Sequence, residues 1–199
     1  MNQNTLVIFD FDGTITTKDT MLDLVKWHFG FTKFCLGMLR IFPKLFLYKI
    51  GFIPNDKAKE IFLNHFFGGM DYKNFCDLSE KYSLQIVDSI LHPQALEKIK
   101  FYKSKNCKMI IITASAAEWV RPWAVCNGFD DVLSSQLEVK DGKVTGKLVG
   151  KNCYGVEKVN AFIAKYGALE NYYTIGFGDS AGDKEILEKV NQPYYRKYE

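Results

Sequence analysis

The sequence predicts an α/β fold in which helices cover both faces of a mostly parallel sheet. Two short apolar runs, at residues 6–9 and 109–112, have the length and the branched side chains of strands that are buried on both faces. From the second run onward, helix-like and strand-like segments alternate along the chain. Such alternation implies right-handed crossovers between parallel strands.

Length and composition describe an ordinary globular protein. The 199 residues suit one α/β domain with an insertion, and 47% hydrophobic and 25% charged residues allow a substantial core. A net charge of +3 without a long Lys/Arg run argues against a nucleic-acid partner. The five cysteines are scattered and form no C-x-x-C pair, which argues against a disulfide framework or a zinc site. No charged-then-apolar leader precedes the first strand, so we expect a cytoplasmic protein.

The first half of the chain contains one strand and then a long helical stretch. The strand covers about residues 5–11, and residues 15–92 then show many aromatics but no strand alternation. Helical spacing is clear at residues 19–29 and 56–67. Three breaks interrupt the stretch, at Pro43, at Pro54 and at Gly68-Gly69. We therefore expect a core made of residues 1–14 and 93–199, with residues 15–92 inserted as a helical cap.

The second half contains the remaining strands of the core. Pro93 begins a helix that leads into the strand at 109–112, and a further helix over 116–127 ends at Gly128. Asp141-Gly142 accepts the positive φ of a tight turn and predicts a hairpin. Trp119 and Trp123 are expected in the core. The other predicted elements are strands at 132–139, 144–149 and 172–176, helices at 155–166 and 184–190, and a short strand near Tyr194.

Two carboxylates stand at the end of the first strand, in the segment Asp-Phe-Asp-Gly-Thr. Because alternate residues of a strand share a side, Asp10 and Asp12 should project together. Open α/β sheets bind ligands just beyond this end of the strand. Two like charges in one place need a cation or a chemical task to compensate their repulsion. The structural alternative is an acidic turn closed by Gly13, with Asp12 as a helix cap.

Polar groups also follow the second core strand and begin a later helix. Thr113 and Ser115 place hydroxyls where a helix starts, and the free N–H groups there suit phosphate oxygens. For Ser115, a simple N-cap role is the alternative. Lys158 lies near the start of another helix, either as a point charge for a phosphate or as a solvated surface group.

A second acidic segment, Gly-Asp-Ser-Ala-Gly-Asp, follows the strand at 172–176. Its glycines permit close approach of the backbone, and Asp183 alone could serve as a helix cap. Together with Asp10 and Asp12, Asp179 completes a set of hard oxygen ligands of the kind that Mg²⁺ prefers.

These segments, in this order, resemble the four motifs of the haloacid dehalogenase (HAD) superfamily over nearly the whole chain. The helical insertion resembles a C1-type cap. Residues 113–123 and the Cys153-x-Gly155-x-x-Lys158 pattern resemble subfamily IB, the phosphoserine phosphatase-like group. The resemblance implies a Rossmann-like core sheet and a Mg²⁺-dependent phosphatase that forms an aspartyl-phosphate.

The resemblance also implies roles for individual residues. Asp10 would be the nucleophile, and Asp12 the general acid and base. Phosphate binding would fall to Thr113, Lys158 and Gly13. The metal ligands would be Asp10, the backbone carbonyl of Asp12, and Asp179, with Asp183 and Ser180 in support.

The resemblance implies a phosphorylated small molecule as substrate, and the sequence leaves its identity open. In phosphoserine phosphatases a glutamate shortly after the first motif reads the substrate amine, and Asp19 is the corresponding residue here. Gly13 also stands where those enzymes usually have serine. Both departures weaken a phosphoserine assignment, while an amine-bearing substrate stays open. A phosphotransferase or mutase on the same site is a further alternative, although nothing marks an acceptor sugar.

The apolar stretch at residues 31–53 raises a lipid alternative. Lys33, Arg40 and Lys44 form a narrow basic stripe at helical spacing, while Pro43 and the charges argue against a transmembrane span. Such a segment can lie in a membrane interface, and it resembles the cap of members that hydrolyse phosphatidylglycerophosphate. The second expectation is therefore a lipid-phosphate phosphatase in peripheral contact with anionic lipid at the inner membrane face. Two alternatives stay open. Either the segment forms a cap helix that simply packs on its neighbours with its basic residues in solvent, or the whole protein is a non-catalytic module that binds a membrane or partner.

Overall fold

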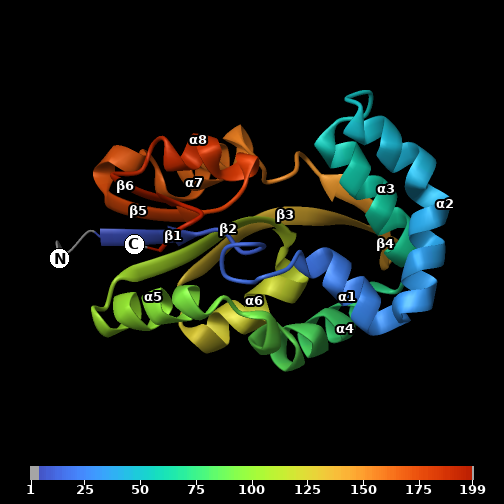
Figure 1. Cartoon of the computed structure of the whole chain (residues 1–199), viewed down its shortest axis with the longest axis horizontal. Coiled ribbons are helices and arrows are strands. Elements are labelled where there is room, and N and C mark those ends of the chain that lie inside the picture. Colours follow the sequence, from blue (N-terminus) through green and yellow to red (C-terminus); the bar gives the residue numbers. More distant parts are fainter. Residues whose placement is uncertain (1–4, 199) are drawn as a thin grey trace.

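The computed structural model describes residues 5–198, in which six strands form one sheet (Figure 1). The strand order is β4-β3-β2-β1-β5-β6, and every neighbouring pair is parallel except β3 and β4. The strands are β1 (Thr5–Phe9), β2 (Lys108–Ala116), β3 (Asp131–Lys140), β4 (Lys143–Val149), β5 (Tyr173–Gly178) and β6 (Gln192–Tyr195). The predicted α/β class and the hairpin at Asp141-Gly142, where both residues have positive φ, are confirmed.

Helices cover both faces of this sheet. On one face lie α5 (Pro93–Ser104) and α6 (Ala117–Asn127), and on the other lie α7 (Val156–Tyr166) and the short α8 (Lys184–Leu187) (Figure 1). Alternate residues of β1 divide between the two layers, because Val7 and Phe9 pack on the α6 side while Leu6 and Ile8 pack on the α7 side. The predicted burial of Trp119 and Trp123 of α6 is confirmed.

The chain between β1 and α5 is helical, as expected. It forms α1 (Thr20–Phe29), α2 (Phe31–Lys49), α3 (Asn55–Phe67), α4 (Tyr72–Gln85) and the 3₁₀ turn η1 (Val87–Ile90). Helix α3 packs on β4, α4 packs on α6, and α2 lies outermost, against α3 (Figure 1). The side chains of Phe62 and Phe75 join the same apolar core as the sheet. The division into core and cap at residues 14 and 92 stays a prediction.

The segments by which the chain enters and leaves these helices are paired with each other. The N–H of Thr17 donates to the carbonyl of Ile90 at 2.7 Å, and the N–H of His92 donates to the carbonyl of Ile15 at 2.8 Å. Thr16 and Leu91 form an antiparallel bridge between them. The entrance and exit of the insertion therefore form one narrow two-chain connection.

Three local expectations were wrong. Strand β1 ends at Phe9, two residues early, although the N–H of Asp10 still donates to Phe177 of β5 at 2.9 Å. Helix α2 continues through Pro43, where both the proline and Leu39, the residue whose carbonyl loses its helical partner, are exposed. Helix α8 ends at Leu187, before the expected residue 190.

Candidate active site

The carboxyl ends of β1, β2 and β5 open into a cavity of about 590 Å³. Helices α1, α2 and α3 form its opposite wall. Nearly all the predicted site residues line it: Asp10, Asp12, Gly13, Asp19, Thr113, Lys158, Asp179 and Ser180. Asp183 is not among the lining residues and is almost fully buried, at 1% exposure.

Lys158, in the first turn of α7, is the cation at the floor of this cavity. Its Nζ donates to Oδ1 of Asp10 and to Oδ1 of Asp183, each at 2.5 Å, and to the carbonyl of Ile112 at 2.9 Å. These contacts use all three of its N–H bonds. Only 2% of Lys158 is exposed, so the alternative of a solvated surface lysine is wrong.

The charges at the floor do not balance, because one ammonium faces two buried carboxylates. Burial raises the pKa of Asp10 to about 8, and the nearby Asp183 adds to this effect while Lys158 opposes it. Although burial disfavours its charge, the two carboxylates hold the pKa of Lys158 above its usual value. Lys158 is therefore a permanent cation, and Asp10 lies where a further cation would be stabilised.

Replacing Lys158 by Met should destabilise the fold strongly. The substitution leaves Asp10 and Asp183 buried without their shared counter-charge, and breaking such a buried pair costs about 3–5 kcal/mol. Urea unfolding measures the loss. Lys184→Met is the matched control, because Lys184 is exposed and its Nζ lies 3.8 Å from Glu188 on the surface of α8; it should change the unfolding free energy by less than about 1 kcal/mol. Equal effects of the two substitutions would contradict the assignment.

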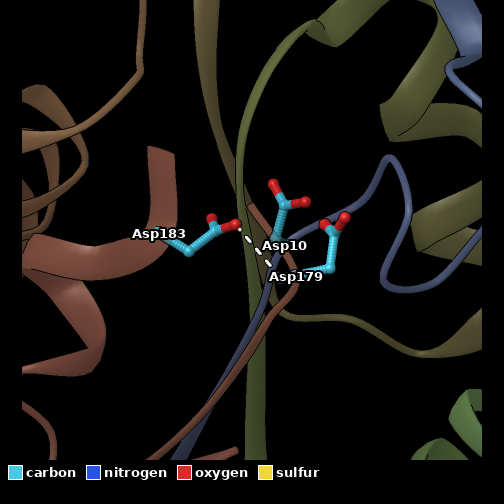
Figure 2. A group of neighbouring side chains, drawn as sticks. All are labelled: Asp10, Asp179 and Asp183. Atoms are coloured by element: carbon cyan, nitrogen blue, oxygen red, sulfur yellow. Dashed lines mark hydrogen bonds between the residues drawn. The ribbon is translucent and has the colours of Figure 1, made fainter. Parts of the chain in front are cut away.

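Three carboxylates converge beside Lys158. Oxygens of Asp10, Asp179 and Asp183 all lie within 4.8 Å of one another, and Figure 2 shows Asp183 approaching from the side opposite to Asp179. Burial and the neighbouring Asp183 raise the pKa of Asp179. Its Oδ1 accepts a hydrogen bond from the hydroxyl of Thr14 at 3.2 Å. This set of crowded hard oxygens fits a small divalent cation.

Asp183 supports this group from behind. Its Oδ2 accepts the N–H of Asp179 at 3.2 Å (Figure 2). The same oxygen accepts the N–H of Ser180 at 2.9 Å and the Ser180 hydroxyl at 2.8 Å, while Oδ1 binds Lys158. Ser180 in turn caps the 3₁₀ turn η3 (Ala181–Asp183). Both oxygens of Asp183 are therefore occupied, which leaves Asp10 and Asp179 as the better-placed carboxylates for a cation.

Gly13 makes room for Asp179. Its φ of +81° lies in the left-handed region, and a Cβ there would stand 2.4 Å from Oδ2 of Asp179. A side chain at residue 13 would therefore displace one carboxylate of the group.

Asp12 lies apart from the acidic group and is tied to two other elements. Its Oδ1 accepts from the N–H and hydroxyl of Thr20 at 2.7 and 2.6 Å, and its Oδ2 accepts from the hydroxyl of Ser115. The indole of Trp119 donates to Thr20 at 3.1 Å and fixes it. Thr20 is the first residue of α1, so the alternative that Asp12 serves as a helix cap is partly right. The carboxylate of Asp12 also lines the cavity.

The hydroxyls of Thr113 and Ser115 have separate partners. Both residues lie in the last four positions of β2 and not at the start of a helix, because the strand continues to Ala116. Ser115 does not cap α6, since the N-cap residue is Ala116, whose backbone is extended. The hydroxyl oxygen of Thr113 accepts the N–H of Ser115 at 3.0 Å. Within residues 5–198 no side-chain hydrogen bond from the Thr113 hydroxyl is found, so its hydrogen can be donated to a ligand in the cavity.

Asp19 has a structural role at the cavity edge. Its Oδ1 accepts the N–H of Leu22 at 3.0 Å, which makes it the N-cap of α1. The residue also lines the cavity, so its predicted role in specificity stays a prediction.

Lys59 of α3 is the main cavity residue that the sequence did not single out. Its Nζ donates to the carbonyl of Ala114 and, at 3.3 Å, to Oδ1 of Asn152. Asn152 is itself held by the hydroxyl of Ser135 at 2.7 Å and donates to Asn55 at 2.5 Å. Burial lowers the pKa of Lys59 to about 8. No spacing rule links α3 to the strand ends, so only the packing of the insertion reveals this residue.

The chain is a member of the haloacid dehalogenase-like hydrolases, whose family model matches residues 7–188. This confirms the predicted resemblance. Among curated proteins, it is 33% identical to protein CicA of Caulobacter vibrioides over 192 residues, which cover 96% of this chain and 85% of that protein.

Two solved structures share the fold. A protein of unknown function from Bordetella pertussis superposes with a TM-score of 0.80 at 20% identity, covering 96% of this chain and 89% of that one. A phosphoserine phosphatase with bound substrate gives a TM-score of 0.66 at 17% identity, covering 98% of this chain and 87% of that one. At these identities the structural likeness shows the fold alone.

Proposed function

We propose that the protein is a Mg²⁺-dependent phosphomonoester hydrolase that works through an aspartyl-phosphate on Asp10. The observation that carries the proposal is the buried Asp10 at the cavity floor, held by Lys158 and flanked by Asp179. One Asp10 oxygen is fixed at 2.5 Å from the lysine, which leaves the other for attack.

The chemistry divides between Asp10 and Asp12. Asp10 attacks phosphorus, the bond from phosphorus to the ester oxygen breaks, and Asp12 gives its proton to the departing alcohol. Asp12 then takes a proton from the water that attacks the aspartyl-phosphate, which releases inorganic phosphate and restores Asp10. Thr20 and Ser115 hold Asp12 in one orientation for both steps.

The floor needs more positive charge than the chain provides before it can hold a phosphate. Lys158 carries one positive charge, which it shares with Asp10 and Asp183, and the hydroxyl of Thr113 can donate a hydrogen bond to a phosphate oxygen. Asp10, Asp179 and the backbone carbonyl of Asp12 are the groups that would hold Mg²⁺, which would supply the remaining charge when bound.

A lipid phosphate is the second candidate substrate. The wall made by α1, α2 and α3 includes Asn55 and Lys59 and, beside them, a group of apolar side chains: Met21, Leu22, Met38, Leu45 and Phe62. This wall suits a substrate whose phosphate is attached to an apolar group.

A panel of phosphate esters tests the function and separates the candidates. Purified protein with Mg²⁺ is assayed for phosphate release from soluble amino-alcohol phosphates, sugar phosphates and lipid phosphates in mixed micelles. Release from at least one class supports the proposal. No release from any class, with Mg²⁺ present, would contradict it. The predicted cytoplasmic location is a separate expectation, which fractionation of cells tests.

Lys59 gives this site an expected pH dependence. Two of its N–H bonds are used by Ala114 and Asn152, and the third can bind an anionic substrate. Because its pKa is lowered to about 8, Lys59 loses its charge as the pH rises through that value. We therefore expect KM to increase roughly tenfold between about pH 7 and pH 9, since one lost charge-assisted hydrogen bond is worth about 1.5–3 kcal/mol.

Lys59→Arg is the matched variant, because arginine keeps its charge throughout this range. Steady-state kinetics should show a nearly flat KM for Lys59→Arg, while any titration of Asp10 affects both proteins alike. Identical pH profiles of KM in the two proteins would exclude Lys59 from substrate binding.

A further inference from the structure

Helix α2 exposes a large apolar surface on the outer side of the molecule. It forms the outermost layer beside α3, away from the sheet (Figure 1). The exposed fractions of Leu39, Phe42 and Phe52 are 71%, 59% and 79%. We use the name outer apolar face for the exposed large apolar residues of α2 and the turn after it: Phe31, Leu36, Leu39, Phe42, Phe46, Leu47, Ile50 and Phe52. A contiguous surface of this kind marks a site of interaction.

The charged side chains of α2 are all basic. Residues 24–55 contain no aspartate or glutamate, and all five of their lysines and arginines are exposed. Lys33, Arg40 and Lys44 follow one another along one flank of α2, within about 40° at helical spacing. Beside α2 lies a hollow of about 690 Å³, to which Lys147 adds a further basic group, while Lys57 is paired with Glu60 at 2.7 Å.

The opposite side of α2 is used in the fold. Gly37 packs so closely on α3 that a Cβ there would stand 2.5 Å from the ring of Phe66. Ile41 is buried, and Met38 and Leu45 line the active-site cavity. The apolar residues of the outer face therefore have no role in covering the protein core. In the described residues, no helix is long and apolar enough to cross a membrane.

We propose that the outer apolar face rests on the surface of an anionic lipid bilayer. A helix with an apolar face bordered by lysine and arginine has the form of one that lies in the plane of a membrane interface. The basic flank would then meet lipid phosphates, and the aromatic and aliphatic residues would enter the boundary with the acyl chains. A second copy of the chain is a poorer occupant, because pairing two such faces would bring two all-basic borders together.

This docking would place the active site at the bilayer. The same helix that carries the outer face lines the catalytic cavity with Met38, Leu45 and Tyr48. The inference concerns where the protein lies and does not depend on the proposed hydrolysis, so the two can fail separately.

Sedimentation of the full chain with lipid vesicles tests the proposal. Vesicles of phosphatidylcholine are compared with vesicles that contain about 30 mol% phosphatidylglycerol, and salt is raised from about 0.1 M to 1 M. We expect strong recovery with anionic vesicles at low salt and its loss at high salt. The triple substitution Lys33→Gln, Arg40→Gln, Lys44→Gln should weaken the partition coefficient roughly a hundredfold, because each basic group contributes about fivefold.

Two further variants separate charge from apolar contact. Lys81→Gln, Lys100→Gln, Lys189→Gln removes the same charge from three exposed lysines outside α2 and should leave most of the binding intact. Leu39→Ser, Phe42→Ser keeps the charge and should weaken binding at least tenfold, since each loses a large apolar side chain from the interface. All three variants should keep their turnover of a soluble phosphate ester, and the Asp10→Asn protein should bind vesicles like the unaltered chain.

Equal recovery with neutral and anionic vesicles, or recovery with neither, would overturn the proposal. So would an equal loss of binding in the two charge variants, because net charge and not the α2 face would then be responsible. A dimer in sedimentation velocity that Leu39→Ser, Phe42→Ser converts to monomer would instead assign the face to a second copy.

Discussion

Asp10→Asn is expected to reduce turnover by at least about a thousandfold while the protein stays folded. The amide matches the carboxylate in size and can still accept a hydrogen bond from Lys158, which keeps Asp183 as its ionic partner. The amide introduced by this substitution cannot attack phosphorus in place of the Asp10 carboxylate. Phosphate release measures the loss, and circular dichroism with thermal unfolding checks the fold.

Asp77→Asn is the control for this substitution. Asp77 is exposed on α4, outside the cavity, so the same chemical change there should leave turnover within about twofold. If freshly purified Asp10→Asn kept several per cent of the activity, another residue would have to be the nucleophile. An unfolded Asp10→Asn protein would show that the carboxylate is needed for the fold, and the aspartyl-phosphate would then be sought by mass spectrometry of the unaltered chain.

Removal of divalent cations should reduce turnover by at least about a hundredfold. Asp10, Asp179 and an incoming phosphate would bring several negative charges to a floor that has Lys158 as its buried ammonium. Treatment with EDTA should remove the activity, and addition of excess Mg²⁺ should then restore the rate. Ca²⁺ should restore little, because it takes more ligands at longer distances and can draw both oxygens of Asp10 into coordination.

Thermal unfolding gives a second measurement of Mg²⁺ binding. Saturating Mg²⁺ should raise the melting temperature of the unaltered protein, since a cation that binds the folded state alone stabilises it. Asp179→Asn should lose this shift, while Asp77→Asn should keep it. Full turnover in the metal-free protein would contradict the proposed cofactor.

The sequence predicted those parts of the molecule that depend on local chemistry. The hairpin at Asp141-Gly142 follows from a turn that needs positive φ, and the apolar run at 109–112 follows from burial on both faces of the sheet. Asp10 and Asp179 could be placed near each other because both follow parallel strands that end at the same edge. These inferences need only short-range patterns and the direction of the strands.

Contacts made by the inserted helices could not be predicted in this way. Lys59 reaches Ala114, and Thr20 reaches Asp12, through the tertiary packing of α3 and α1. The sequence predicts Lys158 at the phosphate, but its bridge between Asp10 and Asp183 depends on how α7 packs beside β2, the end of β1 and the turn η3. Pro43 predicts a break because the sequence does not show that it lies on the exposed side of a helix that packs through its other face.

The narrow connection at residues 15–17 and 90–92 has an evolutionary consequence. Because the chain leaves and returns at hydrogen-bonded neighbours, the core closes the same short gap whatever number of residues lies between them. The free energy of closing a longer loop rises only slowly, by about 0.6 kcal/mol for each doubling of its length. Changes in the length of the helices beyond this connection can thus leave the strand ends that carry Asp10 and Asp179 in place, while Thr20 and Lys59 change with the helices that carry them. Selection can in this way alter what the molecule recognises while the two carboxylates at the strand ends are kept.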